Sequence, residues 1–244
     1  MKETAPSERV FLSAEWRDLV MLNYEVDPAR LRSHVPSGTE LDSFDGKTFV
    51  SLVGFRFLRT KLFGAIIIPF HSNFDEVNLR FYVRRLEGAT LRRGVVFIRE
   101  IVPRRAIADV ARLFYGENYT RHPMRHSIKR DGTRVMAEYQ WQFERHWCRL
   151  HAGATGIPAI PLEGSLEQFI TEHYWGYSRK RAEACVEYHV SHIPWQVWTA
   201  TSAGFEGDGD GLYGSGFGLV LGREPDSAFI ADGSAVQVFR GTRI

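Results

Sequence analysis

The stretch FHSNFDEVNLRFYV, residues 70–83, decides the fold because it alternates between apolar and polar side chains with a period of two residues. That period predicts a β-strand, which Pro69 and Gly88 bound. Its apolar side chains point to one face and form a core surface: Val77, Leu79, Phe81 and Val83. Its hydrogen-bonding side chains, which include both signs of charge, point to the other face: Glu76, Asn78, Arg80 and Tyr82.

The polar face of this strand has two interpretations. Outer faces of antiparallel sheets are often polar, so the four side chains could simply be solvated. If the face points inward, a carboxylate, an amide, a guanidinium and a phenol line a pocket. Glu76 and Asn78 are then roughly 7 Å apart, which is close enough to hold one small ligand between them. Arg80 is about twice that distance from Glu76, so these two would pair with groups on other strands.

A second segment favours the pocket. Residues 95–102, VVFIREIV, predict an apolar strand, and Arg104 and Arg105 follow Pro103 before a helical pattern. The start of a helix attracts anions, so two cations there make sense if Glu100, Glu76 or a bound carboxylate compensates them. The alternative is that both arginines are surface residues whose stems cover apolar neighbours. The helical pattern comes from Ile107, Val110, Ala111 and Phe114.

Composition excludes several classes of function. The 244 residues are 44% hydrophobic and 25% charged, as in an ordinary globular protein, and a net charge of +2 gives no support for a nucleic-acid partner. Cys148 and Cys185 lie far apart without a CxxC pattern, which favours reduced thiols in the cytoplasm. We see no signal-peptide core and no apolar run long enough to cross a membrane, so we expect a cytoplasmic, soluble protein.

We expect a loose tail over residues 1–10 and a single domain over residues 11–244. Strands predominate, which predicts an α+β, mainly antiparallel β fold: a curled sheet or barrel with a few packed helices. Helices are expected at 27–35, at 104–115 and from the Ser165–Gln168 capping box to about residue 174. The glycine-rich residues 204–218 are interpreted as a flexible turn. Further strands are expected at 48–57, 65–68, 124–130, 133–143, 186–201, 228–231 and 235–239, with hairpin turns at Asp131-Gly132 and Asp232-Gly233.

The nine histidines have no convincing metal-ligand spacing, and no motif predicts a cofactor. His71, next to the strand of residues 74–83, is the histidine best placed to reach a pocket. His192 is interpreted as fixing a strand end, with a role in the site left open. No serine lies in a GxSxG elbow, so nucleophilic acyl chemistry has no support.

The order of these motifs resembles acetoacetate decarboxylase: a strand with an aromatic-x-Glu pattern, a second strand, then Glu-x-x-Pro and two adjacent cations before a helix. A more specific resemblance, over about residues 11–240, is to an uncharacterised bacterial family called YqjF-like, which is grouped with acetoacetate decarboxylase by fold. It is carried by Trp16-Arg17, NYEVDPARLRSHV at 23–35, VSLVGF at 50–55, residues 73–83, and His192-Ile193-Pro194-Trp195.

The chain departs from acetoacetate decarboxylase at the two cations. In that family they are lysines, and the first forms a Schiff base with a β-keto acid. A lysine beside another cation loses its proton readily, whereas an arginine stays protonated and is a poor nucleophile. Here both positions, Arg104 and Arg105, are arginine, and none of the chain's five lysines lies in an apolar run beside another cation. The resemblance therefore implies a pocket and not the Schiff-base reaction.

Three hypotheses follow. The first is a small-molecule enzyme or ligand-binding protein whose interior pocket takes an anionic ligand, a carboxylate or keto acid. Glu76 would be an acid/base or counter-ion and Asn78 would orient the ligand, while Arg104, with Arg80 and Arg105, would hold its carboxylate. Catalysis is assigned to Glu76 and Arg104, and substrate binding to Asn78, Arg80, Tyr82, Glu100, Arg105 and His71.

The second hypothesis is a non-catalytic sensor on the same fold, and the third is a structural protein whose polar strand face is solvated. Burial of Glu76 separates the third from the others, and turnover separates the first two. We expect a monomer or homodimer, with no nucleic acid, membrane, metal or cofactor as partner.

Overall fold

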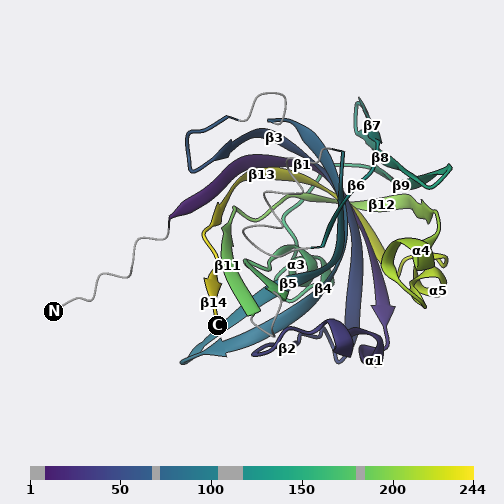
Figure 1. The fold of residues 1–244 in the computed structure, drawn as a ribbon. Coiled ribbons are helices and arrows are strands. Elements are labelled where there is room, and N and C mark those ends of the chain that lie inside the picture. The colour runs from purple at the N-terminus through teal and green to yellow at the C-terminus, as the bar shows by residue number, and fades with distance from the viewer. Residues whose placement is uncertain (1–8, 68–71, 104–117, 180–184) are drawn as a thin grey trace.

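A computed structural model describes residues 9–67, 72–103, 118–179 and 185–244. It is mostly strand with few helices, as predicted (Figure 1). The helices are short: α1 Pro28–Leu31, the 3₁₀ turn η1 Arg32–His34, α3 Leu166–Thr171, α4 Gly209–Tyr213 and α5 Phe217–Leu221. The strands are β1 Val10–Val26, β2 Glu40–Leu41, β3 Thr48–Leu62, β4 Phe74–Glu87, β5 Thr90–Val102, β6 Tyr119–Arg121, β7 Met124–Asp131, β8 Arg134–Phe143, β9 His146–Thr155, β10 Trp175–Arg179, β11 Cys185–Ser191, β12 Val197–Glu206, β13 Ser227–Phe239 and β14 Thr242–Arg243.

Seven of the described strands close into a ring in the order β1, β3, β4, β5, β10, β11 and β13, and β13 pairs with both β11 and β1. All neighbours in the ring are antiparallel except β5 and β10. Glycine permits the close approach at this parallel seam, because a Cβ atom on Gly94 of β5 would lie 2.6 Å from the carbonyl oxygen of Trp175 in β10. Beyond β13 the sheet continues through β12, β9, β8 and β7.

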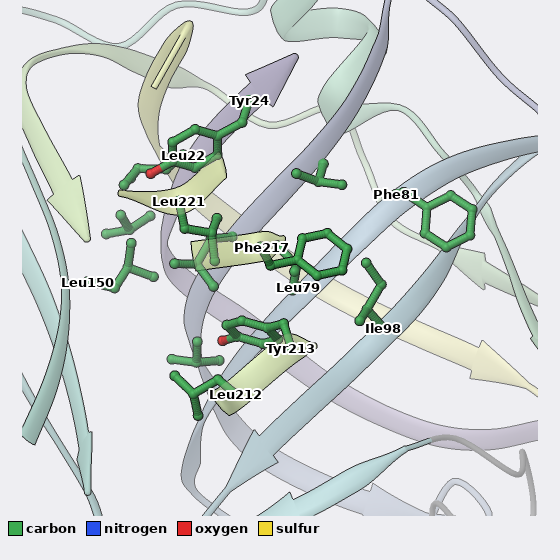
Figure 2. Close-up of a cluster of buried hydrophobic side chains, with 14 of the residues drawn as sticks. Leu22, Tyr24, Leu79, Phe81, Ile98, Leu150, Leu212, Tyr213, Phe217 and Leu221 are labelled. Carbon is green, nitrogen blue, oxygen red and sulfur yellow. The ribbon is translucent and has the colours of Figure 1, made fainter. Parts of the chain in front are cut away.

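One face of β4 is anchored in the hydrophobic core. Leu79 and Phe81 pack with side chains of β1, β5 and β9 beneath the two short helices α4 and α5 (Figure 2). Leu212, Tyr213, Phe217 and Leu221 of these helices are all buried. Burial of one such side chain contributes about 1.5–3 kcal/mol, so this face fixes β4 firmly and leaves its other face for the ring interior.

The glycine-rich segment differs from its prediction, because it forms α4 and α5 and is not simply a turn between strands. Asp208 caps α4 by accepting a hydrogen bond from the Gly211 amide at 2.9 Å. Asp210 Oδ1 accepts from the amides of Gly216 and Gly218, each at 2.7 Å. A Cβ atom on Gly218 would meet that carboxylate at 2.8 Å, so a larger residue would disturb the cap.

Other predicted boundaries need correction. The prediction of a hairpin turn at Asp232-Gly233 is wrong. Strand β13 continues through these two residues and pairs with β1 on both sides of them, with Gly233 at φ +81°. The strand predicted at 186–201 is divided into β11 and β12 around Pro194. Of residues 65–68, only Ile66 makes a β-bridge among those that the structure describes. Strands β1, β2, β6, β9, β10 and β14 were not predicted.

The remaining predicted elements can be compared directly. The hairpin of β7 and β8 is confirmed, and so are the helix starts capped by Asp27 and Ser165. Helix α3 ends at Thr171, earlier than predicted. The helix predicted at 104–115 lies outside the described residues.

Candidate functional site

The ring encloses a cavity of about 130 Å³. One water needs only about 10–15 Å³, so the cavity has room for a small organic molecule. Much of its wall is aromatic, from Trp16, Phe55, Phe57, Phe74 and Trp195. Its polar groups come mainly from β4 and β5, together with the segment that follows α3: Glu76, Asn78, Arg80, Glu100 and His173.

The polar face of β4 lies on this cavity. Glu76 and Asn78 are 2% and 1% exposed, and Arg80 is 9% exposed. Asn78 Nδ2 donates a hydrogen bond to Glu76 Oε1 at 2.9 Å, and the Tyr119 hydroxyl donates to Glu76 Oε2 at 3.3 Å. Asn78 Oδ1 is buried and has no hydrogen-bond partner within the described ranges. The structure thus places three of the predicted side chains together, in the ring interior.

A β-bulge in β5 brings Glu100 to the same wall. Leu79 pairs with Arg99, but Arg80 pairs with Phe97, so Ile98 is an extra residue in β5. Phe97 and Glu100 therefore both face the cavity, although strict alternation would place them on opposite faces. Glu100 is 1% exposed and lies opposite Asn78.

Arg80 is a buried cation. Its Nη2 donates to the Ile170 carbonyl at 3.2 Å, and its Cζ lies 5.8 Å from the centre of the Tyr82 ring. Its Nε is buried and has no hydrogen-bond partner in the described part of the chain. Among the residues that the structure describes, no carboxylate forms an ion pair with Arg80.

Tyr82 was predicted to bind substrate, but the structure places it below the cavity wall and not on it. Its ring packs against Phe169 and His173. Its hydroxyl is 2.5 Å from Ser51 Oγ, which also lies 2.6 Å from Asn23 Oδ1. Tyr82 therefore supports the wall through a buried polar network.

Two residues of the site were missed by the sequence analysis. His173, whose side chain is 1% exposed, lines the cavity, and its Nε2 lies 3.4 Å from Asp42 Oδ2. Burial lowers the pKa of His173, and the Asp42 carboxylate opposes this only in part. Burial alone would raise the pKa of Asp42, but His173 and Arg93 together lower it below its ordinary value. We therefore treat the pair as a neutral imidazole beside a carboxylate.

The pair was missed because no local pattern joins its members. Asp42 directly follows β2 and His173 follows α3, and the two are 131 residues apart. The backbone amide of Asp42 donates to the Tyr82 carbonyl at 3.0 Å, which fixes the carboxylate beside β4. The one local signal in the sequence is that His173 closely follows the capped helix α3.

His71, Arg104 and Arg105 lie outside the described residues, so their roles stay predictions. His192 also lines the cavity, where it stacks on Trp195 with ring centres 4.3 Å apart. Within the described ranges, no group of three or more His, Cys, Asp or Glu side chains gathers as a metal site would require. The same ranges contain no helix long and apolar enough to span a membrane.

The fold is that of acetoacetate decarboxylase-like proteins. The structure matches acetoacetate decarboxylase from Legionella pneumophila with a TM-score of 0.66 and 12% identity, over 100% of this chain and 92% of that chain. An acetoacetate decarboxylase-like enzyme from Sphingomonas wittichii RW1 matches with 0.67 and 13%, over 100% and 98%. The enduracididine biosynthesis enzyme MppR, complexed with pyruvate, matches with 0.64 and 14%, over 99% and 93%.

Within that fold class, the chain belongs to the DUF2071 family of uncharacterised conserved proteins, whose model matches residues 13–235. Its relatives include the uncharacterised protein YqjF of Bacillus subtilis strain 168. The two sequences are 27% identical over 187 residues, which cover 76% of this chain and 74% of YqjF. Both resemblances seen in the sequence are therefore confirmed.

Proposed function

We propose that this protein binds a small carboxylate or keto acid in the ring cavity, as an enzyme or as a ligand-binding protein. The observation that carries the proposal is Arg80. A buried charge is normally paired, and this guanidinium has an unused Nε donor and no ion pair among the described residues. A ligand carboxylate would supply the missing charge through the planar fork of donors.

The other polar groups have defined parts in the proposal. Glu76 serves as acid/base or counter-ion. Asn78, whose Oδ1 has no partner among the described residues, orients the ligand. Glu100 lies beside Asn78 and contributes a second carboxylate. Arg104 and Arg105 are proposed to approach the same cavity from the segment after β5 and to help hold the anion.

The aromatic part of the wall defines the rest of the ligand. Trp16, Phe57 and Phe74 contribute apolar surface, and Phe57 stacks on Phe74 at 4.5 Å between ring centres. An acid with an apolar tail would bury that tail here, which is favourable in proportion to the area removed from water. The preferred ligand is therefore a carboxylate with a short apolar chain.

Schiff-base chemistry is not part of the proposal, because arginine stands at positions 104 and 105. We expect borohydride reduction in the presence of acetoacetate to leave every lysine unmodified, as measured by mass spectrometry of peptides. A reduced adduct on any lysine would contradict this. The pyruvate complex of MppR supports the ligand class only through likeness of fold.

Isothermal titration calorimetry tests the binding site, with 4-methyl-2-oxopentanoate and its uncharged amide as ligands. We expect the acid to bind about 10- to 100-fold more tightly than the amide, because a hydrogen bond to a charged group contributes about 1.5–3 kcal/mol. Arg80→Met should lose this preference. Arg84→Met is the matched control, since Arg84 lies on the same strand and pairs with Glu40 away from the cavity.

The stability of Arg80→Met separates a binding role from a structural one. Replacing a buried unpaired charge by an apolar side chain of similar length should leave the fold as stable or more stable. Equal binding of acid and amide by the parent protein, or unchanged selectivity in Arg80→Met, would overturn the proposed function.

A further inference from the structure

The Asp42–His173 pair gives the cavity a group that the binding proposal does not use. His173 is buried on the cavity wall, and its Nδ1 has no hydrogen-bond partner among the residues that the structure describes. Its Nε2 faces the Asp42 carboxylate at 3.4 Å, and Arg93 Nε lies 3.2 Å from the same carboxylate oxygen. The Asp42 carboxylate thus contacts Nε2, and Nδ1 is the imidazole nitrogen that has no partner among the described residues.

The contact with Asp42 determines which nitrogen carries the proton. A carboxylate only accepts hydrogen bonds, so the neutral imidazole places its hydrogen on Nε2. Nδ1 then carries the lone pair. Burial favours the neutral imidazole, as do the positive charges of Arg80 and Arg93. A neutral imidazole with a buried lone pair is suited to act as a proton acceptor.

His173 and Arg80 occupy one part of the site. The ring of Tyr82 contacts both, with its centre 4.7 Å from the His173 ring centre and 5.8 Å from Arg80 Cζ. Arg80 also donates to the carbonyl of Ile170, three residues before His173 in the chain. Both side chains also line the cavity, so an acid held by Arg80 would share that cavity with His173.

We propose that His173 is a general base that removes a proton from the carbon next to the keto group of a 2-oxo carboxylate, with Asp42 as its positioning residue. This inference rests on the proposed function, because Arg80 must first hold the acid. The C–H bond breaks and its proton moves to His173 Nδ1. The electron pair forms the carbon–carbon double bond of an enolate, whose negative oxygen the Arg80 cation stabilises. Return of the proton from His173 restores the keto acid.

Deuterium exchange tests this step directly. Incubation in D₂O with 4-methyl-2-oxopentanoate should place deuterium at C3, which proton NMR follows as loss of the C3 signal. We expect exchange faster than in buffer alone, with a rate that rises with pH as His173 loses its proton. His173→Gln keeps an N–H group for Asp42 but no base, and should lower the enzyme-dependent rate by about 10²- to 10⁴-fold.

The positioning role of Asp42 has its own readout. Asp42→Asn removes the negative charge that favours the protonated imidazole, so the acidic limb of the pH–rate profile should move to lower pH. The matched controls are His126→Gln and Asp75→Asn. His126 Nδ1 and Asp75 Oδ2 form a better hydrogen bond, 2.9 Å, but neither residue lines the cavity, so these variants should exchange at the parent rate.

Calorimetry on the same samples separates this inference from the proposed function. Binding without any enzyme-dependent exchange overturns the base at His173 and leaves the binding proposal standing. Exchange that persists in a folded His173→Gln variant, or an acidic limb that does not move in Asp42→Asn, also overturns it. Absence of binding overturns both proposals.

Discussion

The charge of Glu76 can be tested separately from its shape, because Glu76→Gln replaces one carboxylate oxygen by an NH₂ group of nearly the same size. In the parent protein the carboxylate accepts hydrogen bonds from Asn78 at 2.9 Å and from Tyr119 at 3.3 Å. A hydrogen bond to a charged group contributes about 1.5–3 kcal/mol and a neutral one about 0.5–1.5. We therefore expect a loss of about 1 kcal/mol at each contact, or about 2 kcal/mol in total.

Urea denaturation followed by tryptophan fluorescence measures this loss. With a slope of about 2–3 kcal/mol/M, the midpoint of Glu76→Gln should fall by about 0.7–1 M. Glu87→Gln is the control, because Glu87 lies at the exposed end of the same strand, where its ion pair with Arg85 contributes at most about 1 kcal/mol. An unchanged or higher midpoint for Glu76→Gln would refute the reasoning and mean that the carboxylate is not needed for stability.

Two further predictions concern Asp42 and the cysteines. The pKa of Asp42 is lowered in the folded state, so its contribution to the free energy of unfolding is full above the ordinary pKa and is lost as the pH falls through the folded pKa. The difference in denaturation midpoint between the parent and Asp42→Asn should therefore shrink below about pH 4, and a constant difference would contradict this. Burial raises the pKa of Cys185 to about 11, and Cys148 is also buried with a raised pKa, so neither thiol should react with Ellman's reagent at pH 8 until the protein is denatured. Rapid reaction of the native protein would contradict this expectation.

The alternation in residues 74–83 predicted β4 and the division of its faces, because a strand sends successive side chains to opposite sides whatever its surroundings. It did not decide between solvent and interior for Glu76. That depends on the closure of the ring, where β11 pairs with β13 at Val190 and Val238. These residues are far from β4 in the sequence, so the burial of Glu76 depends on long-range strand pairing.

The bulge at Ile98 shows a second limit of prediction from the sequence. Alternation in residues 95–102 places Phe97 and Glu100 on opposite faces, and the structure brings both to the cavity. An extra residue in one strand changes every later position by one, and the apolar residues around Ile98 give no signal for it. The same applies to Asp232-Gly233, where the pair indicated a turn but Gly233 takes its positive φ within a continuous strand.

The two faces of β4 also explain how a polar cavity can persist in a stable fold. A site with buried charges tends to cost stability, because charges lose their hydration when they are buried. Here Leu79 and Phe81 on the opposite face pack under α4 and α5, so the strand is held independently of the contacts of Glu76 and Arg80. The cavity face can therefore keep donors and acceptors that are incompletely used, such as Arg80 Nε and Asn78 Oδ1. It follows that Arg80→Met should alter ligand binding more than it alters folding, whereas Leu79→Ala should do the reverse.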